Sequence, residues 1–491
     1  MSTTVKTRKI IHQKLQEAVV PTITASALGS FVASDKYGIL PNQPSFYVAS
    51  NAVAYMQSAQ QNMAPVQLPA SGIAGSSGSN AGMCGEFHPL SAPAGNITNT
   101  ATAGTNSSMT TALNITRNLA GHRIVVVAGT GSGYDGTIAY NTIGASAIIT
   151  VVTPNGVAFD NTTQYRIYGG SLWYMNAGTV AVGFSVYDVI TNTWTARSVT
   201  NLPTLWGTDA QLSTTPSAYS NGGLGFVNGT ATAATSTTLS DSTKTLPVNG
   251  FANVYQIRIK SGTGAGQIRE IVSNTASQFT VATWTVTPDA TSVYVIEGND
   301  DVMFLMGNAA VTLYKFRIST NAWVVLSPTA ARSGAPGAGN SFSWIPNVKT
   351  DSKWSDETYT TSLAGVTRQN GRNFYSFRGT ANAVCDVYDG ALNTWISNIS
   401  YGNSTTTFTS GTHSTEIDGH IYIQKELTNY VYRFDIAENR LEPYFYWYVS
   451  QGAVLVGNRI WLIQFVDGST RLTYLYSMLH TSTQIVRVLD I

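Results

Sequence analysis

SVYDVITNTWTARSVTNLP, residues 185–203, carries a pattern that recurs later in the chain. In this first copy an aromatic residue, Tyr187, is followed by Asp188, Asn192 and Trp194. Three later segments keep the same offsets, with Arg in place of Asp in the first and Leu in place of Trp in the last: Phe316–Trp323, Tyr388–Trp395 and Phe434–Leu441. Recurrence of one spaced pattern indicates internal repeats.

Each copy predicts a β-hairpin. The aromatic residue ends one strand, and Asp and Asn form the turn, because their side chains bond nearby backbone and tolerate left-handed dihedral angles. Trp begins the return strand, where it can bury a large apolar area between neighbouring sheets. We therefore expect Trp194, Trp323 and Trp395 to be buried at equivalent positions.

A glycine pair and a hydrophobic strand precede the first copy, at 169–170 and 171–174. Together with the hairpin, residues 169–203 resemble the kelch repeat of β-propellers. The later copies lack the glycine pair and have single glycines near the corresponding places. The resemblance implies a propeller with about five recognisable blades, within the usual four to eight, but it implies no chemistry. The single glycines are Gly307, Gly371, Gly419 and Gly457.

A second repeat lies upstream of the first two hairpins. The segment 113–124 aligns with 246–257, and the glycine-rich runs 129–133 and 262–266 follow in register. The offset between copies is 133 at these glycines and 129 at the turn asparagines, so one four-residue gap accounts for the difference. Residues 110–200 and 243–330 therefore read as a tandem duplication of a small β-module followed by a blade.

Gly131, Gly133 and Gly136 match the G-x-G-x-x-G pattern of dinucleotide-binding sites. Such a site needs a helix immediately after the glycines. The next residues are rich in β-branched and turn types, and the second copy lacks the third glycine. We therefore predict that the glycines supply positive φ angles in a hairpin.

Composition limits the classes of function. Charged residues make up 11% of the 491-residue chain, against roughly 25% in an ordinary soluble domain. The hydrophobic content is 43%, so disorder is not indicated. The net charge of +1 gives no bulk attraction for nucleic acid or anionic membrane. Two cysteines, Cys84 and Cys385, favour neither a disulfide framework nor a zinc site.

The N-terminal region differs from the rest. Residues 7–20 predict an amphipathic helix that either packs or docks a partner, and 48–62 predict a second possible helix. Glu86 is the only charged residue between 37 and 116. We interpret this region as an extended arm ordered by packing on other subunits, with a flexible linker as the alternative. No secretory signal or membrane-spanning apolar run is recognised.

The expected fold is mainly β, a kelch-like propeller with two inserted β-modules and an extended arm. The expected domains are an arm with short helices, a β-module, a blade, a second β-module and the remaining blades: 1–112, 113–168, 169–228, 229–298 and 299–491.

The search for chemistry gives no predicted catalytic, cofactor or metal residue. The six histidines, including His413 and His420, lack metal-ligand spacing. Cys84, Glu86 and His88 are close in sequence, but nucleophilic catalysis needs groups that converge on a rigid frame. The remaining candidates are two carboxylate pairs, read as loop charge, and an aromatic run, read as core packing or a sugar platform: 300–301, 356–357 and 444–448.

These observations favour a structural protein over an enzyme. Low charge, tandem β-modules and degenerate propeller repeats resemble tailed-bacteriophage virion proteins, including the propeller nozzle proteins of short-tailed phages. The resemblance implies a homo-oligomeric ring in the tail or head–tail junction, made in the host cytoplasm, that contacts other virion proteins through the arm. The alternatives are a host-glycan-binding propeller (a receptor-binding, head-decoration or fibre protein) and an enzyme such as a kelch-type oxidase or glycan lyase.

Overall fold

The computed structural model describes most of the chain between residues 84 and 446 and the backbone of six outlying strands. In these residues the protein is mainly β and has no α-helix; one 3-10 turn spans Pro93–Gly95. The described ranges, apart from a few single residues, are 29–33, 56–57, 61–62, 66–68, 84–176, 182–203, 210–215, 227–307, 311–334, 339–344, 373–379, 383–401, 406–409, 412–417, 420–425, 430–435, 440–446, 459–465 and 473–479.

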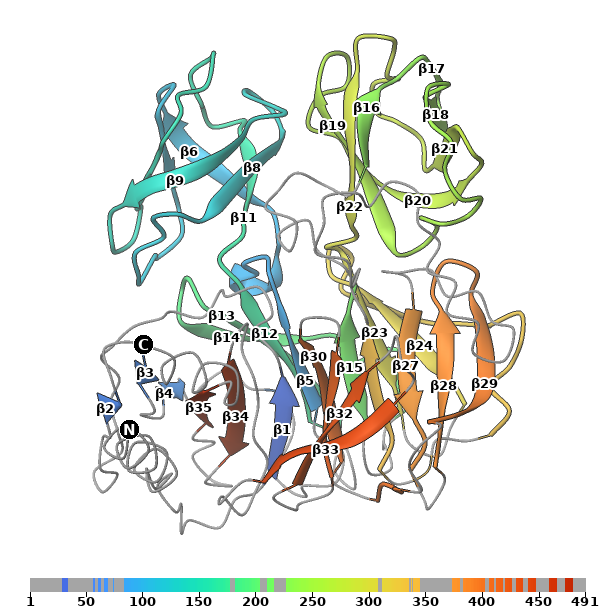
Figure 1. The fold of residues 1–491 in the computed structure, drawn as a ribbon. Coiled ribbons are helices and arrows are strands. Elements are labelled where there is room, and N and C mark those ends of the chain that lie inside the picture. The colour runs from blue at the N-terminus through green and yellow to red at the C-terminus, as the bar shows by residue number, and fades with distance from the viewer. Residues whose placement is uncertain are drawn as a thin grey trace, which may run out of the picture.

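Four antiparallel sheets of four strands have a propeller-like arrangement in the lower half of Figure 1. Their inner strands contact one another in sequence, β5 with β15, β15 with β26, and β26 with β30. Each sheet is a blade, named by its inner strand. The strands are β5 (Cys84–His88), β12 (Ser171–Asn176), β13 (Gly183–Asp188) and β14 (Thr193–Arg197); β15 (Gln211–Thr214), β23 (Val302–Met306), β24 (Leu313–Arg317) and β25 (Ala322–Val325); β26 (Ser341–Trp344), β27 (Asn373–Phe377), β28 (Val384–Asp389) and β29 (Thr394–Ser400); and β30 (His413–Ile417), β31 (His420–Gln424), β32 (Tyr430–Asp435) and β33 (Arg440–Tyr446).

The repeated hairpin forms the two outer strands of these blades. Tyr187 pairs with Trp194, and the same aromatic–Trp pairing recurs in the β15 and β26 blades. The turn asparagines Asn192, Asn321 and Asn393 have φ angles of 54°, 52° and 50°. All three tryptophans are buried. The predicted left-handed turn and the predicted burial of the tryptophans are both confirmed.

Aromatic side chains fill the spaces between blades. Trp173 and Phe184 of the β5 blade pack on Phe316 and Trp323 of the β15 blade, with Phe184 and Phe316 ring centroids 4.9 Å apart. Similar apolar clusters join the β15 blade to the β26 blade and the β26 blade to the β30 blade. Burial of these large rings between adjacent blades contributes a large apolar stabilisation to the arrangement.

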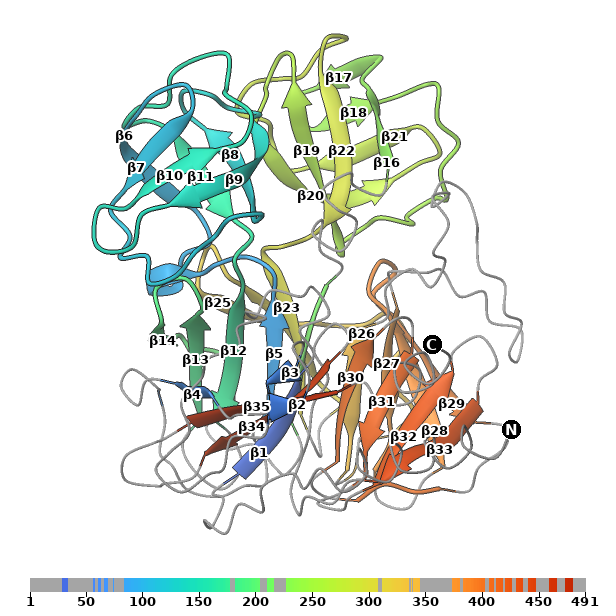
Figure 2. The same ribbon diagram turned by 60° about the vertical axis from the view of Figure 1, so that its left-hand side comes forward.

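A closed six-stranded barrel lies on one end of the propeller (Figures 1 and 2). Its strands follow β5 in the chain and precede β12, and its core includes Ile190 of the β5 blade. Two of its strands precede residue 113, where the sequence places the start of the module. The strand order is β10-β7-β6-β11-β8-β9, with β6 (Asn99–Gly104), β7 (Ser108–Thr111), β8 (Arg123–Ala128), β9 (Asp135–Asn141), β10 (Ile148–Val151) and β11 (Gln164–Ile167).

A seven-stranded sheet lies beside the barrel and is called here the second module. Its strands lie between β15 and β23 in the chain. It pairs its strands in the order of the barrel, except that two short strands, β16 and β17, take the place of β6. The order is β16-β22-β19-β20-β21-β18-β17, with β16 (Val227–Thr230), β17 (Ala233–Thr235), β18 (Thr238–Ser240), β19 (Tyr255–Ser261), β20 (Ile268–Asn274), β21 (Gln278–Val281) and β22 (Val293–Gly298).

Strands from the N-terminal region pair within this same chain. β1 (Gly29–Ala33) and β4 (Val66–Leu68) are the edge strands of a further sheet, β1-β34-β35-β4, with β34 (Arg459–Phe465) and β35 (Thr473–Leu479) between them. The interpretation of residues 1–112 as an arm on other subunits therefore does not hold for β1, β4, β5, β6 and β7, whose partners are intramolecular.

The helix predicted for 48–62 is wrong at its C-terminal end. There the chain forms a short hairpin in which β2 (Met56–Gln57) pairs with β3 (Gln61–Asn62). The segment lacks a sustained helical period and a capping signal, so little favours a helix over the hairpin. The helix predicted for 7–20 lies outside the described residues. No helix in the described part is long and apolar enough to span a membrane.

Candidate functional site

Cys84, Glu86 and His88 all lie on the inner strand β5. All three residues are buried. Burial raises the pKa of the Cys84 thiol and lowers the pKa of His88 to about 3. The backbone N–H of Leu90 donates to His88 Nδ1 at 3.2 Å. A protonated thiol and a neutral, engaged imidazole in a packed strand are poor nucleophile and base.

The other sequence candidates do not converge. His413 and His420 lie on adjacent strands, but in the register His413 is opposite Gln424 and His420 is opposite Ile417. Among the described residues no group of three metal-ligating side chains occurs. Residues 356–357 and 447–448 lie outside the described part of the chain.

Asp300 and Asp301 have different partners. Asp300 is buried and accepts a hydrogen bond from the Tyr168 hydroxyl at 2.9 Å. Burial and the nearby charge of Glu297 raise the pKa of Asp300 to about 7. Asp301 instead pairs with Arg317, 3.1 Å from Nη1 to Oδ2. The two carboxylates therefore serve as structural groups and do not face a common cleft.

Of the three glycines in the G-x-G-x-x-G match, Gly131 and Gly133 lie at a hairpin turn with positive φ, as predicted, whereas Gly136 lies inside strand β9 and does not have positive φ. Gly131 and Gly133 have φ angles of 83° and 91°, and strand β9 follows instead of a helix. In the second module Gly264 and Gly266 have φ angles of 80° and 88°. The backbone has the same left-handed conformation at equivalent glycines, which L side chains adopt at a cost.

These two turns pack against each other. A Cβ on Gly133 would lie 2.3 Å from the carbonyl oxygen of Lys260, and a Cβ on Gly266 would lie 2.9 Å from that of Val127. The sequence alignment makes Val127 equivalent to Lys260 and Gly133 equivalent to Gly266. The barrel and the second module thus meet through equivalent surfaces, as two subunits do about a two-fold axis.

A cluster of four charges crosses this contact. Arg258 Nη2 lies 2.7 Å from Glu297 Oε1 within the second module and 2.8 Å from Asp135 Oδ2 of the barrel. Arg123 of the barrel lies 2.8 Å from Asp135 and 3.1 Å from Glu297. The side chains of Arg258 and Glu297 are 1% and 0% exposed. We call these four residues the inter-module cluster.

The electrostatics of the inter-module cluster favour the charged forms. Burial acts to raise the pKa of Glu297, but the charges of Arg258 and Arg123 outweigh it and hold the pKa below its ordinary value. The same balance holds for Asp135. Burial acts to raise its pKa, but Arg123 and Arg258 outweigh burial and hold the pKa below its ordinary value. Each charge has an opposite partner, which a buried ion needs.

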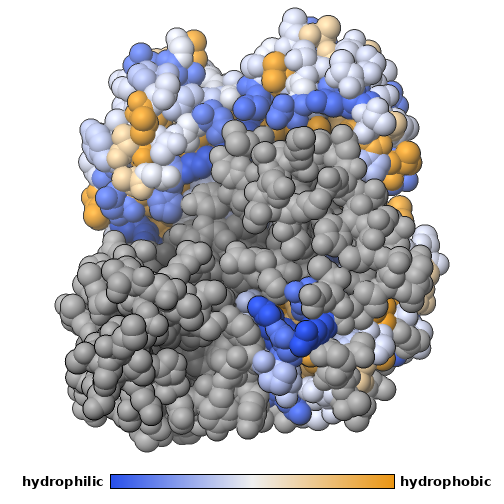
Figure 3. Space-filling view, viewed as in Figure 1, coloured by the Kyte–Doolittle hydropathy of each residue, from blue (hydrophilic) through white to orange (hydrophobic). Residues whose placement is uncertain are grey.

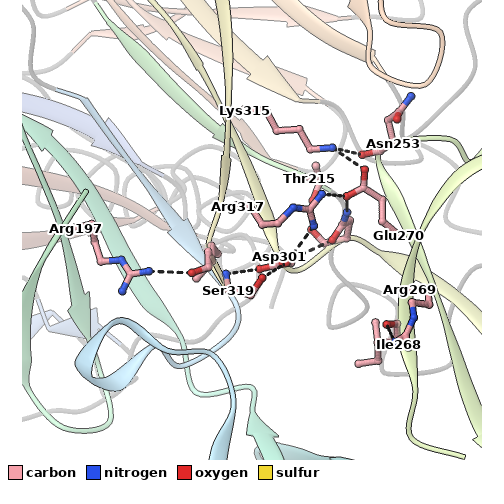
Figure 4. Close-up of polar contacts among 12 residues, drawn as sticks. Arg197, Thr215, Asn253, Ile268, Arg269, Glu270, Asp301, Lys315, Arg317 and Ser319 are labelled. Atoms are coloured by element: carbon pink, nitrogen blue, oxygen red, sulfur yellow. Dashed lines mark hydrogen bonds and ion pairs between the residues drawn. The ribbon is translucent and has the colours of Figure 1, made fainter. Parts of the chain in front are cut away.

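A second cluster joins the second module to the β15 blade (Figure 4). Glu270 of β20 lies 2.8 Å from Lys315 Nζ and also pairs with Arg317, both on β24. The Asn299 side-chain amide donates to Glu270 at 2.9 Å. Burial raises the pKa of Glu270, but Lys315 and Arg317 lower it below its ordinary value. We call Glu270, Asp301, Lys315 and Arg317 the module–blade cluster.

A matching network of threonines fixes the loops of both modules. Asp160 accepts hydrogen bonds from the hydroxyls of Thr130 at 2.7 Å and Thr162 at 2.6 Å. In the second module Asp289 accepts hydrogen bonds from the hydroxyls of Thr263 at 2.7 Å and Thr291 at 2.6 Å. The barrel and the second module therefore share these hydrogen bonds at equivalent positions as well as their strand order.

Comparison with known proteins gives no family. No family model matches the chain, and no curated protein matches it. Among solved structures, a mitotic checkpoint complex chain is 10% identical, with a TM-score of 0.25 over 88% of this chain and 100% of that chain. The calcium-binding protein regucalcin from Agrobacterium tumefaciens is 11% identical, with a TM-score of 0.25 over 62% and 85%. Luciferin-regenerating enzyme is 9% identical, with a TM-score of 0.24 over 62% and 86%. Likenesses this low carry no information on activity.

The inter-module cluster and the module–blade cluster both connect separate parts of the fold. The charged side chains of both clusters are neutralised by one another, so they present no free acid, base or ligand set within the described residues. The two clusters connect barrel, second module and blade across three bodies of the fold. Sequence reasoning missed Arg123, Asp135, Arg258 and Glu297, although charged residues inside strands of so uncharged a chain were a usable signal.

Proposed function

We propose that the protein is a structural component of a bacteriophage particle, in the tail or head–tail junction, where copies assemble into a ring. The observation that carries the proposal is the pair of β-modules held on one end of the propeller by buried, mutually neutralised charges. Such a joint gives two bodies a fixed orientation, which assembly requires and turnover does not. The low charge of the chain supports burial of its surface by partners.

The proposal includes a finer description of the fold, a kelch-like ring of five blades with two inserted modules. The sheet β1-β34-β35-β4 is the fifth blade, since β1 contacts both β5 and β30. The ring is then closed by strands from both ends of the chain. Each module is an insertion between the first and second strands of a blade, which supports duplication of a module–blade unit.

The second candidate function is recognition of a host-surface glycan. Tyr140 supports it, since it is the aromatic residue among the large hydrophobic side chains that stand exposed in the described residues. An exposed ring can stack on a sugar face. Binding of the isolated protein on a glycan array, lost in Tyr140→Ala, would favour this function over a purely structural one.

The experiment for the proposed function has two parts. Full-length protein is examined by mass photometry and negative-stain electron microscopy, where rings of several copies are expected. Particles released from cells that carry the gene are purified and analysed by quantitative mass spectrometry, with immunogold labelling to locate the chain. Stoichiometric recovery at the tail or head–tail junction supports the proposal. Absence of the chain from intact particles, or location in the cell alone, overturns it.

A further inference from the structure

An uncharged face with exposed apolar side chains lies on the outer surface of the barrel. Figure 3 shows hydrophobic residues along the outer edge of the barrel, at the upper left. Tyr140 is 57% exposed, Ile148 41% and Val152 61%, and Ile143 in the loop between their strands is 67% exposed. We call these four residues the barrel face.

The strand register relates the barrel-face residues of β9 and β10. Tyr140 on β9 is opposite Thr150 on β10. Ile148 lies two positions from Thr150 on the same side of the strand, so Tyr140 lies diagonally opposite Ile148. The register shifts by one residue between Thr150 and Val151, and beyond the shift Val152 donates its N–H to the Thr137 carbonyl at 2.9 Å. Exposed apolar side chains thus stand on two neighbouring strands of the barrel and on the loop that joins them.

The second module shows that the fold does not require apolar residues at these positions. Asn141 and Asn274 are equivalent, because each accepts a backbone N–H through its side chain and each is opposite a buried residue of the next strand. The residues that align with Tyr140, Ile148 and Val152 are Ser273, Gln278 and Ala282. The barrel therefore carries large apolar side chains where its sister module has polar or small ones.

The surroundings of the barrel face select an uncharged partner. No charged residue occurs between 136 and 159, and none between 99 and 116, the segments that form the adjoining strands. A partner with an ordinary charged surface would lose hydration here without gaining an opposite charge. Another copy of this chain, with 11% charged residues, offers a matching surface.

The second module also carries exposed apolar side chains. Val272 on β20 is 53% exposed and Val248 is 65% exposed. Both lie toward the C-terminal end of β20, where the Asn274 side chain donates to the Pro247 carbonyl at 2.8 Å and the Asn249 N–H donates to the Asn274 carbonyl at 2.8 Å.

We propose that the barrel face of one copy docks on the Val248 and Val272 site of the second module of the next copy. The contact joins unlike surfaces, so it repeats from copy to copy, and it gives a ring when the rotation between copies closes. The inference rests on the proposed assembly into rings and names the surface that builds them. The inter-module cluster fixes the angle between the two docking surfaces of each copy.

The test replaces the barrel face with the residues that its sister module carries. The variant is Tyr140→Ser, Ile148→Gln and Val152→Ala in the full chain, and its oligomeric mass is measured by sedimentation velocity over a range of concentrations. The control is Val324→Ser, a residue 55% exposed on β25 of the propeller. We expect the triple variant to dissociate at concentrations at least about tenfold higher than wild type, with an unchanged melting temperature. The control should assemble as wild type does.

A covalent test fixes the partner. Tyr140→Cys and Val272→Cys are combined in one chain, whose native cysteines Cys84 and Cys385 are buried, and a short bismaleimide is added. Cross-linked ladders of two or more chains are expected, and each single variant should give none. If wild type forms rings that the triple variant also forms, or if no ladder appears, the docking surface is wrong while the structural function stands. If wild type is monomeric at every concentration, both are overturned.

Discussion

Arg258 is the residue whose loss should most weaken the joint between the two modules. Its side chain is 1% exposed and lies 2.7 Å from Glu297 and 2.8 Å from Asp135. Arg258→Met keeps most of the side-chain volume and removes the charge. Breaking one side of a buried ion pair costs about 3–5 kcal/mol, because the partner charge stays buried. Since Glu297 keeps Arg123 at 3.1 Å, we expect the lower end, about 3 kcal/mol.

The stability lost in Arg258→Met should depend on pH, because it depends on the ionisation of Glu297. The pKa of Glu297 is lowered in the folded protein, so the stability that its pairing provides is complete above its ordinary pKa of 4.5. That stability is lost as the pH falls toward the lowered folded-state pKa, because protonation removes the charge that Arg258 neutralises. The difference between wild type and Arg258→Met should therefore shrink below pH 4.5.

The assay is hydrogen exchange of full-length protein, followed by mass spectrometry of peptides from β19 and β22, together with guanidinium unfolding. Lys260→Met, two residues along the same strand, is the matched control and should cost less than about 0.5 kcal/mol. The double variant Arg258→Met with Glu297→Met leaves Arg123 paired with Asp135, so it should recover most of the loss. A cost below about 1 kcal/mol for Arg258→Met, or a double variant worse than the single one, would refute the reasoning.

Further predictions concern the module contact, the hairpin repeat and one buried acid. Gly133→Ala should loosen the module contact far more than Gly121→Ala. The φ angles of the two glycines are similar, 91° and 88°, but nothing lies within 4 Å of a Cβ on Gly121. The rates of proteolysis between the modules measure this loosening, and equal rates for the two variants would contradict the prediction. Trp323→Ala should cost about 3–5 kcal/mol in denaturant unfolding, as large buried aromatics do; a loss under 1 kcal/mol would mean that the hairpin core is unimportant. Asp300→Asn should stabilise the protein at pH 8 and not at pH 4, because burial raises the folded-state pKa of Asp300 to about 7 and so penalises its ionised form at high pH; thermal melts at both pH values check the sign.

The hairpin repeat was predictable because its determinants are local. A Tyr and an Asn five positions apart are held by one turn, so the Tyr187 hydroxyl donates to Asn192 Oδ1 at 2.7 Å and the Tyr388 hydroxyl donates to Asn393 at 2.8 Å. Where Phe316 lacks the hydroxyl, the amide oxygen of Asn321 accepts the backbone N–H of Ser198 at 2.9 Å. In the two copies with Tyr the repeated spacing thus reflects a contact within five residues, whereas in the copy with Phe316 the partner of Asn321 is 123 positions away.

The joints could not be predicted, because their members are far apart in the chain. Arg123 and Glu297 are 174 positions apart, and nothing in the spacing of either residue marks it as a partner of the other. The inner strand β5 was missed for a related reason. Its five residues, CGEFH, alternate weakly and have no partner nearby in sequence; only pairing with β12 makes them a strand.

The position of the barrel between β5 and β12 affects how the chain can fold. His88 and Ser171 pair across 83 positions, so the first blade begins with a slow, long-range closure. The barrel strands are contiguous in sequence, and pairing of Asn99 with Tyr165 brings the ends of the barrel together. Once that pairing forms, about 17 residues of open chain remain between the two blade strands, which lowers the loop-closure cost by about 1.4 kcal/mol. Prior folding of the barrel would therefore speed nucleation of the blade, and a barrel-destabilising mutation should slow refolding of a sheet that it does not touch.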